Sequence, residues 1–137
     1  MIRLTRFESC VIRKTCESAM SEGLLSISGD LLDQILDKGA EDCDYNGYGY
    51  YLTIRHGGLP QERHFLKGPE FLGRWNGIES GFTVIIEDRE LVLECFPYGG
   101  VIPPDYRDRP VEIYEIEYEI ETEDGGVGGK PKPGRLD

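Results

Sequence analysis

The sequence predicts an α+β domain: a mainly antiparallel sheet of about six strands, with one or two N-terminal helices packed on one face. Three observations lead to this prediction. An apolar stripe at helical spacing lies in the first third of the 137-residue chain. Beyond residue 48, apolar residues alternate with polar ones, as in half-buried strands. Short turn sequences separate these runs, so neighbouring strands are expected to be antiparallel.

The N-terminal third contains one well-defined helix. Ser28 is a suitable N-cap and Gly39 a suitable C-terminal cap. The stripe between them consists of Leu31, Leu32, Ile35 and Leu36. Before this helix, residues 1–7 alternate apolar and polar side chains at Ile2 and Leu4, which predicts a first strand. Residues 10–25 leave the type of element open.

The middle of the chain predicts two hairpins. Residues 50–56 alternate in the manner of a strand, and the turn at residues 57–60 leads into a second run at residues 62–66. The glycine-rich segment 68–81 predicts a short helical turn and a packed loop. The β-rich runs at residues 82–86 and 91–96 flank four charged residues, which predicts the second hairpin.

The C-terminal part predicts a loop, a strand and a tail. Pro103 and Pro104 exclude a helix from residues 97–110, which we expect to form an ordered loop. Residues 111–121 predict the last strand. The final thirteen residues contain five glycines and two prolines. We therefore expect a single globular domain over residues 1–124 and a flexible tail over residues 125–137.

Charge favours some partners over others. The chain has 26 acidic and 15 basic residues, for a net charge of -11. Direct binding to nucleic acid needs clustered Lys and Arg, so it is not expected, and a basic protein partner is favoured. No apolar run approaches the roughly 20 residues that span a bilayer, and the N-terminus lacks the apolar core of a signal peptide. The expected location is therefore the cytoplasm, with no membrane partner.

The acidic surplus lies in two segments, residues 30–44 and 112–124. In the second segment the predicted strand places Ile116, Tyr118 and Ile120 on one face and a row of glutamates on the other. The apolar alternation changes parity near Tyr114, which suggests a bulge. Three interpretations remain open: a solvated outer face, a docking surface for a basic protein, and mimicry of nucleic acid. Mimicry would need both acidic segments on one surface.

A second motif resembles half of a calcium-binding loop. Asp42, Asp44 and Asn46 precede Gly47 with the spacing of an EF-hand, and oxygen ligands at alternate positions suit Ca²⁺. The twelfth position of such a loop is Thr53, which cannot supply the bidentate carboxylate. An ordinary turn is the competing interpretation, and no cofactor is expected.

Catalytic candidates are few. His56 and His64 flank the predicted turn of the first hairpin, and as an acid/base pair they would support a small hydrolase or nuclease. Cys95 lies in an apolar run, where a buried, inert thiol is expected. The four cysteines lack metal-binding spacing and are expected to be reduced.

The hypothesis that fits best is a non-enzymatic, acidic protein that binds a basic protein partner, with inhibition of that partner as a further expectation. Immunity proteins, antitoxins and phage inhibitors have this profile of size and charge, by analogy alone. Exposed tyrosines are common anchors of such surfaces. The residues expected to bind the partner are Glu112, Glu115, Glu117, Glu119, Glu121, Asp42, Asp44, Tyr45 and Tyr48. The hydrolase and a weak calcium-binding module are the alternatives.

Overall fold

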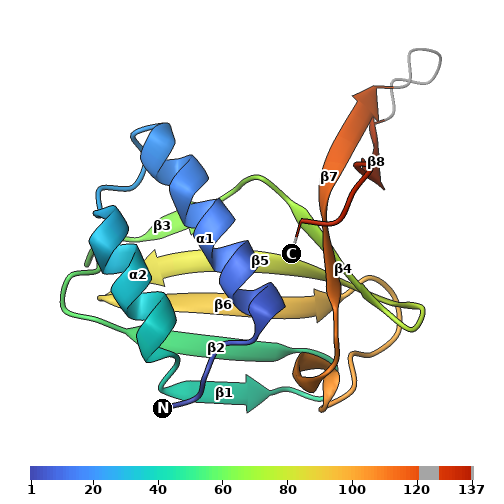
Figure 1. The fold of residues 1–137 in the computed structure, drawn as a ribbon, viewed down its shortest axis with the longest axis horizontal. Coiled ribbons are helices and arrows are strands. Elements are labelled where there is room, and N and C mark those ends of the chain that lie inside the picture. Colours follow the sequence, from blue (N-terminus) through green and yellow to red (C-terminus); the bar gives the residue numbers. More distant parts are fainter. Residues whose placement is uncertain (121–126, 137) are drawn as a thin grey trace.

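Two helices cover one face of an antiparallel sheet (Figure 1). The structure is a computed structural model and describes residues 1–120 and 127–136. The helices are α1 (Arg6–Ser21) and α2 (Gly29–Lys38). The strands are β1 (Asp42–Tyr45), β2 (Tyr50–Arg55), β3 (His64–Leu66), β4 (Phe71–Trp75), β5 (Ile78–Glu87), β6 (Glu90–Pro97), β7 (Glu112–Ile120) and β8 (Val127–Pro131). The predicted α+β class is confirmed, although the sheet has eight strands where about six were predicted.

The strand order determines which distant segments are neighbours. It runs β1-β2-β6-β5-β4-β7-β8, and β3 pairs with β5 on the side that β4 also occupies. The strand β1 therefore forms one edge of the sheet, while β7 and β8 lie at the opposite edge. Within the described residues, no helix is both long and apolar enough to cross a membrane.

Helix α1 replaces the first strand that the sequence predicted. Thr5 Oγ1 accepts a hydrogen bond from Glu8 N at 3.3 Å, and Glu8 Oε1 accepts one from Thr5 N at 2.8 Å, which together form a capping box. The predicted strand at residues 1–7 is wrong, because this cap begins a helix within it. Only Ile2 keeps a strand-like partner, in an isolated bridge to Ala40.

Helix α2 has the bounds and caps that the sequence predicted. Ser28 Oγ accepts a hydrogen bond from Leu31 N at 3.0 Å, and Leu32 and Ile35 are fully buried. Gly39 ends the helix with a φ of 87° and a ψ of -170°. A side chain is strained in this conformation, so glycine is required there.

The predicted hairpin between residues 50–56 and 62–66 is wrong. Strand β2 pairs with β1 and β6, whereas β3 pairs with β5. The connection passes around the β5–β6 turn, where Asp88 N donates to Gln61 O at 2.9 Å and Arg89 N donates to Pro60 O at 3.0 Å. Residues 56–63 form a connection that is too long for a tight turn, so it does not fix which strand β3 pairs with. Burial of apolar side chains then decides that β3 pairs with β5.

The glycine-rich segment 68–81 forms strands rather than the predicted helical turn and loop. It contains β4 and the start of β5, which pair with each other. A Cβ atom added to Gly73 would lie 2.4 Å from Ser80 Oγ, so this glycine permits close packing within the sheet. The second predicted hairpin is confirmed as β5–β6, and residues 97–110 form the predicted loop around a 3-10 turn, η1 (Tyr106–Asp108).

The two faces of the sheet differ. The inner face, which the helices cover, carries the core side chains, among them Leu52, Ile54, Val84, Leu91 and Leu93. A buried ion pair crosses this core: Glu8 is fully buried and receives Arg107 Nη2 at 2.8 Å and Nε at 3.1 Å. Tyr50 Oη also donates to Glu8, at 2.6 Å. No helix of the described residues lies on the opposite, outer face (Figure 1).

Strand β7 runs past the edge of the main sheet. Its pairing with β4 is regular through Tyr114, so the predicted bulge is absent there. From Ile116 it pairs with β8, and the two strands project from the body of the molecule (Figure 1). Strand β8 lies in the segment where the sequence predicted a flexible tail. The side chains of residues 118–120 and the whole of Glu121 lie outside what the structure describes.

Candidate protein-binding face

Basic side chains of residues 130–135 lie beside the acidic strand β7. Lys132 forms an ion pair with Glu115, and Arg135 Nη1 lies 3.8 Å from Glu112 Oε1. Glu117 is exposed and lies opposite Lys130 in the β7–β8 register. The sequence predicted that these glutamates bind a partner, but Glu112 and Glu115 each have a basic side chain of the same chain beside them.

In the residues that the structure describes, the strand parts of the two acidic segments lie near opposite edges of the sheet. Asp42 and Asp44 lie on β1, at one edge of the sheet, and Glu112, Glu115 and Glu117 lie on β7, near the other edge. Five neighbour-to-neighbour steps separate these strands, which is about 24 Å at the usual strand spacing. The arrangement that mimicry of nucleic acid would need is therefore absent from the described residues.

The residues of the calcium-like motif make protein contacts. Asp42 Oδ2 lies 3.4 Å from Arg55 Nη2. Asn46 Oδ1 accepts hydrogen bonds from Tyr48 N at 3.2 Å and from Gly49 N at 2.8 Å, as in an ordinary Asx turn. Over residues 1–120 and 127–136, no three His, Cys, Asp or Glu side chains are grouped so that they could hold a metal ion.

Tyr45 and Tyr48, which the sequence predicted to contact the partner, differ in how far their side chains are exposed for such a contact. Tyr45 is partly exposed, but its hydroxyl donates to Ile102 O at 2.5 Å and so holds the loop that follows β6. Tyr48 is 58% exposed and stands beside the turn. Tyr48 therefore remains a candidate contact residue, while Tyr45 also has a structural role.

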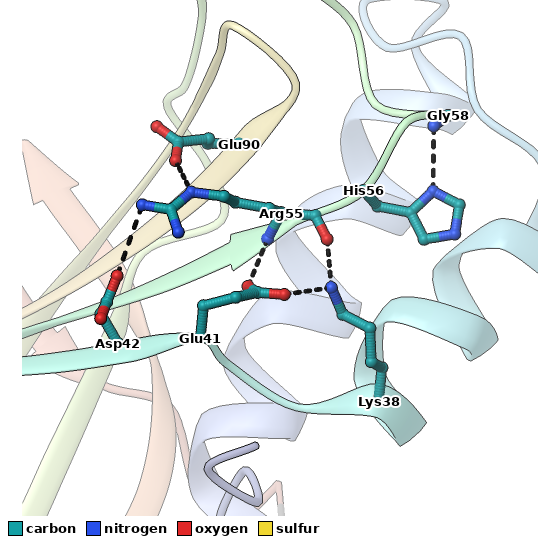
Figure 2. A network of polar contacts seen from close by, with 7 residues as sticks. All are labelled: Lys38, Glu41, Asp42, Arg55, His56, Gly58 and Glu90. Carbon is teal, nitrogen blue, oxygen red and sulfur yellow. Dashed lines mark hydrogen bonds and ion pairs between the residues drawn. The ribbon is translucent and has the colours of Figure 1, made fainter.

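The structure does not bring His56 and His64 together. Their strands are separated by β6 and β5, because His64 pairs with Ile86, Ile86 with Leu91, and Leu91 with Ile54. Three strand spacings amount to about 14 Å. His56 Nδ1 instead accepts a hydrogen bond from Gly58 N at 2.9 Å (Figure 2). This arrangement provides no acid/base pair.

Two of the four thiols are buried and unsuited to catalysis. Cys95 and Cys16 are fully buried, and burial raises the pKa of each thiol to about 12. Both therefore remain protonated at neutral pH and are poor nucleophiles. All four cysteines are free thiols.

A network of charged groups ties helix α2 to the edge of the sheet (Figure 2). Lys38 Nζ contacts both the Glu41 carboxylate and Arg55 O, and Arg55 N donates to Glu41 Oε2 at 2.6 Å. The Arg55 side chain extends to Glu90 and Asp42. Asp42 and Glu90 therefore share one cation on the outer face.

This network predicts a pH dependence. Although burial alone would raise the pKa of Glu41, hydrogen bonds from Lys38 and from Arg55 N lower it overall. A carboxylate with a lowered pKa stabilises the fold above its unfolded-state pKa, and this stability is lost as the pH falls through the folded-state value. We expect Glu41→Gln to lower the free energy of unfolding by about 1 kcal/mol at pH 7.

The difference between wild type and Glu41→Gln should shrink as the pH falls below about 4. Urea unfolding at a series of pH values from 7 to 3 measures it. Asp33→Asn is the control, because Asp33 pairs with Arg13 at 2.8 Å on the exposed surface and should change stability little at any pH. A difference that stays constant or grows in acid would contradict the role given to Glu41.

The outer face carries a row of three apolar residues and one threonine that the sequence did not predict. The strand registers align Thr53 with Val92, Val92 with Ile85, and Ile85 with Phe65. Phe65, at the end of this row, is 47% exposed. We call these four residues the outer row. A solvated sheet face is normally polar, so this row makes the outer face a candidate contact surface.

Acidic groups border one side of the outer row. The adjacent register aligns Asp44, Tyr51, Glu94 and Thr83. The Glu94 carboxylate accepts hydrogen bonds from the hydroxyls of Thr83, at 3.2 Å, and Tyr51, whose pKa this bond raises. No basic side chain pairs with Glu94 or Asp44 in the part of the chain that the structure describes. These two carboxylates leave negative charge beside the apolar row.

A sequence signal for the outer row exists. Residues 84–86 and 91–93 are uninterrupted apolar triplets, and a strand with only one buried face would alternate. Such triplets indicate that both faces of the strand are apolar. That Thr53 and Phe65 lie beside these triplets depends on the strand order, which the sequence does not reveal.

Comparisons with protein-family models, with curated proteins and with solved structures find no match for this chain. The functional conclusion therefore depends on the surface itself.

Proposed function

We propose that this protein binds a basic protein partner through the outer face of its sheet. The observation that carries the proposal is the outer row, a mostly apolar strip on the sheet face opposite the helices. On one side it is bordered by the carboxylates of Asp44 and Glu94, which have no basic partner among the described residues. Apolar side chains provide the buried centre of such an interface, and the carboxylates select a partner with positive charge.

Only some of the residues that the sequence predicted to contact the partner belong to this face. Asp42, Asp44 and the exposed Tyr48 lie at or next to β1, close to the outer row, and remain part of the proposal. Glu112 and Glu115 already have basic neighbours from the C-terminal segment. We place the interaction in the cytoplasm, where four free thiols stay reduced. A partner whose basic surface binds nucleic acid would be inhibited by this contact.

The test compares variants in capture from a lysate of the source cell. Immobilised wild-type protein is expected to retain basic proteins, and Val92→Lys and Glu94→Lys are each expected to lose them by tenfold or more, on the order of an interface hot spot. Val101→Lys is the matched control, since Val101 is exposed but lies in the loop after β6, outside the outer row. Thermal unfolding checks that each variant folds.

Retention of the same proteins by wild type and Val92→Lys would refute the proposal, as would an absence of any captured basic protein. A purified partner gives a second measurement. Because unpaired carboxylates steer a basic partner, the association rate should fall as the salt concentration rises, and it should depend less on salt with Glu94→Gln.

A further inference from the structure

One strand position of the sheet is empty next to β3. Strands β3 and β4 pair with the same side of β5, and β7 covers the far side of β4 through Glu115. At Ile116 the strand β7 leaves the sheet with β8 instead of continuing beside β3 (Figure 1). The edge of β3 that faces away from β5 therefore has no strand partner among the described residues. We call it the β3 edge.

The β3 edge opens into a groove of about 700 Å³ between β3 and the end of α1. Its apolar wall consists of Ala19, Leu24 and Leu66, and Leu24 is 62% exposed. Alternation along the strand places Arg63 and Lys67 on the outer face, on either side of Phe65. Arg63 Nη1 lies 3.4 Å from Glu87, and Lys67 has no acidic partner in the described part of the chain.

The projecting strands provide a second free edge. We call residues 116–120 of β7, together with β8, the arm. Ile116 N donates to Glu70 O on the side away from β8, so alternation turns the backbone groups of residues 118 and 120 to that same side. Among the described residues, these backbone groups have no strand partner on that side, and the sequence of the arm alternates glutamates with apolar residues.

The two edges are complementary in both chemistry and pattern. At the β3 edge, Arg63 and Lys67 line the same groove as the apolar wall, and alternation from Phe65 places them on its outer side. A strand of the arm placed there with its glutamates outward would set acidic groups beside Arg63 and Lys67 and apolar groups against Ala19 and Leu24. Glu22, on the groove wall, and Glu115, which is paired with Lys132, are the acidic groups already present.

We propose that two copies of this chain form a two-fold symmetric dimer, in which the arm of each copy adds to the β3 edge of the other. Within one copy the arm leaves the sheet and does not lie along β3, whereas a reciprocal exchange between two copies satisfies both free edges and closes the assembly. If β3 of one copy paired with β3 of the other around Phe65, Arg63 of one copy would lie opposite Lys67 of the other. These like charges would repel, so the acidic arm is the better partner.

The test is the mass of the full chain in solution, measured by sedimentation equilibrium. Wild type is expected to be dimeric at low salt. Arg63→Glu/Lys67→Glu and Glu117→Lys/Glu119→Lys are each expected to be monomeric, with dimer dissociation constants raised about tenfold or more. An equimolar mixture of the two variants should restore the dimer, because each variant then presents edges complementary to those of the other.

Several results would overturn the dimer. They are a monomeric wild type at every concentration reached, a dimer that survives Arg63→Glu/Lys67→Glu, and a mixture that stays monomeric although circular dichroism shows both variants folded. Glu117→Gln/Glu119→Gln is the milder variant should the lysines disturb the arm, and it should still weaken the dimer. Val92→Lys should leave the dimer intact, so the outcome is separable from that of the proposed partner binding.

Discussion

Replacing Arg107 with methionine is expected to lower the free energy of unfolding by about 3–5 kcal/mol. Glu8 is fully buried, and Arg107 supplies its only cation in the described residues, through two hydrogen bonds. Methionine fills much of the space of the arginine stem but leaves the carboxylate without its counter-charge. An uncompensated buried charge is among the most destabilising consequences of a single substitution.

The loss is larger than that of a single hydrogen bond because Arg107 joins several parts of the fold. Its Nη2 also donates to Arg3 O at 3.0 Å, so the side chain holds the start of α1 against the η1 turn. Tyr50 Oη, at 2.6 Å from Glu8, depends on the same carboxylate. Burial and the neighbouring Glu8 raise the pKa of Tyr50, so the phenol stays neutral and continues to donate.

Urea unfolding of Arg107→Met measures this effect, with Arg109→Met as the matched control. Arg109 pairs with Asp105 on the exposed surface, and its guanidinium lies 5.1 Å from the centre of the Trp75 ring. Its loss should cost about 1 kcal/mol or less. Equal effects of the two substitutions would show that the buried pair does not have the role assigned to it.

Replacing Gly39 with alanine is the second large effect, at about 2 kcal/mol or more. The φ of 87° and the ψ of -170° disfavour any residue with a Cβ atom. The added Cβ would also lie 2.3 Å from Ile2 O, a backbone atom that cannot rotate away. Ile2 is held by the bridge to Ala40, whose two hydrogen bonds are each 2.8 Å long.

Gly29→Ala is the control, because Gly29 lies at the other end of α2, and its added Cβ would meet no described atom within 4 Å beyond its chain neighbours and the backbone of its own helix. Alanine favours helix over glycine, so Gly29→Ala should leave the thermal midpoint unchanged or slightly raised. Gly39→Ala should lower the midpoint by several degrees. A Gly39→Ala variant as stable as Gly29→Ala would contradict the strain inferred at the end of α2.

Local signals in the sequence predicted some elements well. Ser28, the leucine stripe and Gly39 define α2 without help from the rest of the chain, and the β5–β6 hairpin joins adjacent runs across a short turn. Helix α1 was missed although its capping residues, Thr5 and Glu8, are visible in the sequence. The alternation at Ile2 and Leu4 predicts a strand, whereas the capping box of Thr5 and Glu8 begins a helix in the structure.

The order of the strands depends on contacts between residues that are distant in the chain. Local sequence patterns contain little information about such contacts. A short connection suggested that residues 62–66 would pair with β2, but they pair with β5, and the spatial separation of His56 from His64 follows from that pairing. The acidic strand was recognised, whereas its basic neighbour β8 was not, because Val127–Pro131 has few apolar residues to indicate a strand. The outer row likewise emerges only when four strands are placed side by side.

The pairing of Glu8 with Arg107 spans 99 positions of the chain, and this separation bears on how the protein is made. During synthesis from the N-terminus, the first helix exists long before its counter-ion does. Glu8 must remain solvated until the η1 turn has been translated, so α1 cannot take its final buried position while the chain is incomplete. We therefore expect the nascent chain to acquire its native stability late, in the step that brings the η1 turn onto α1.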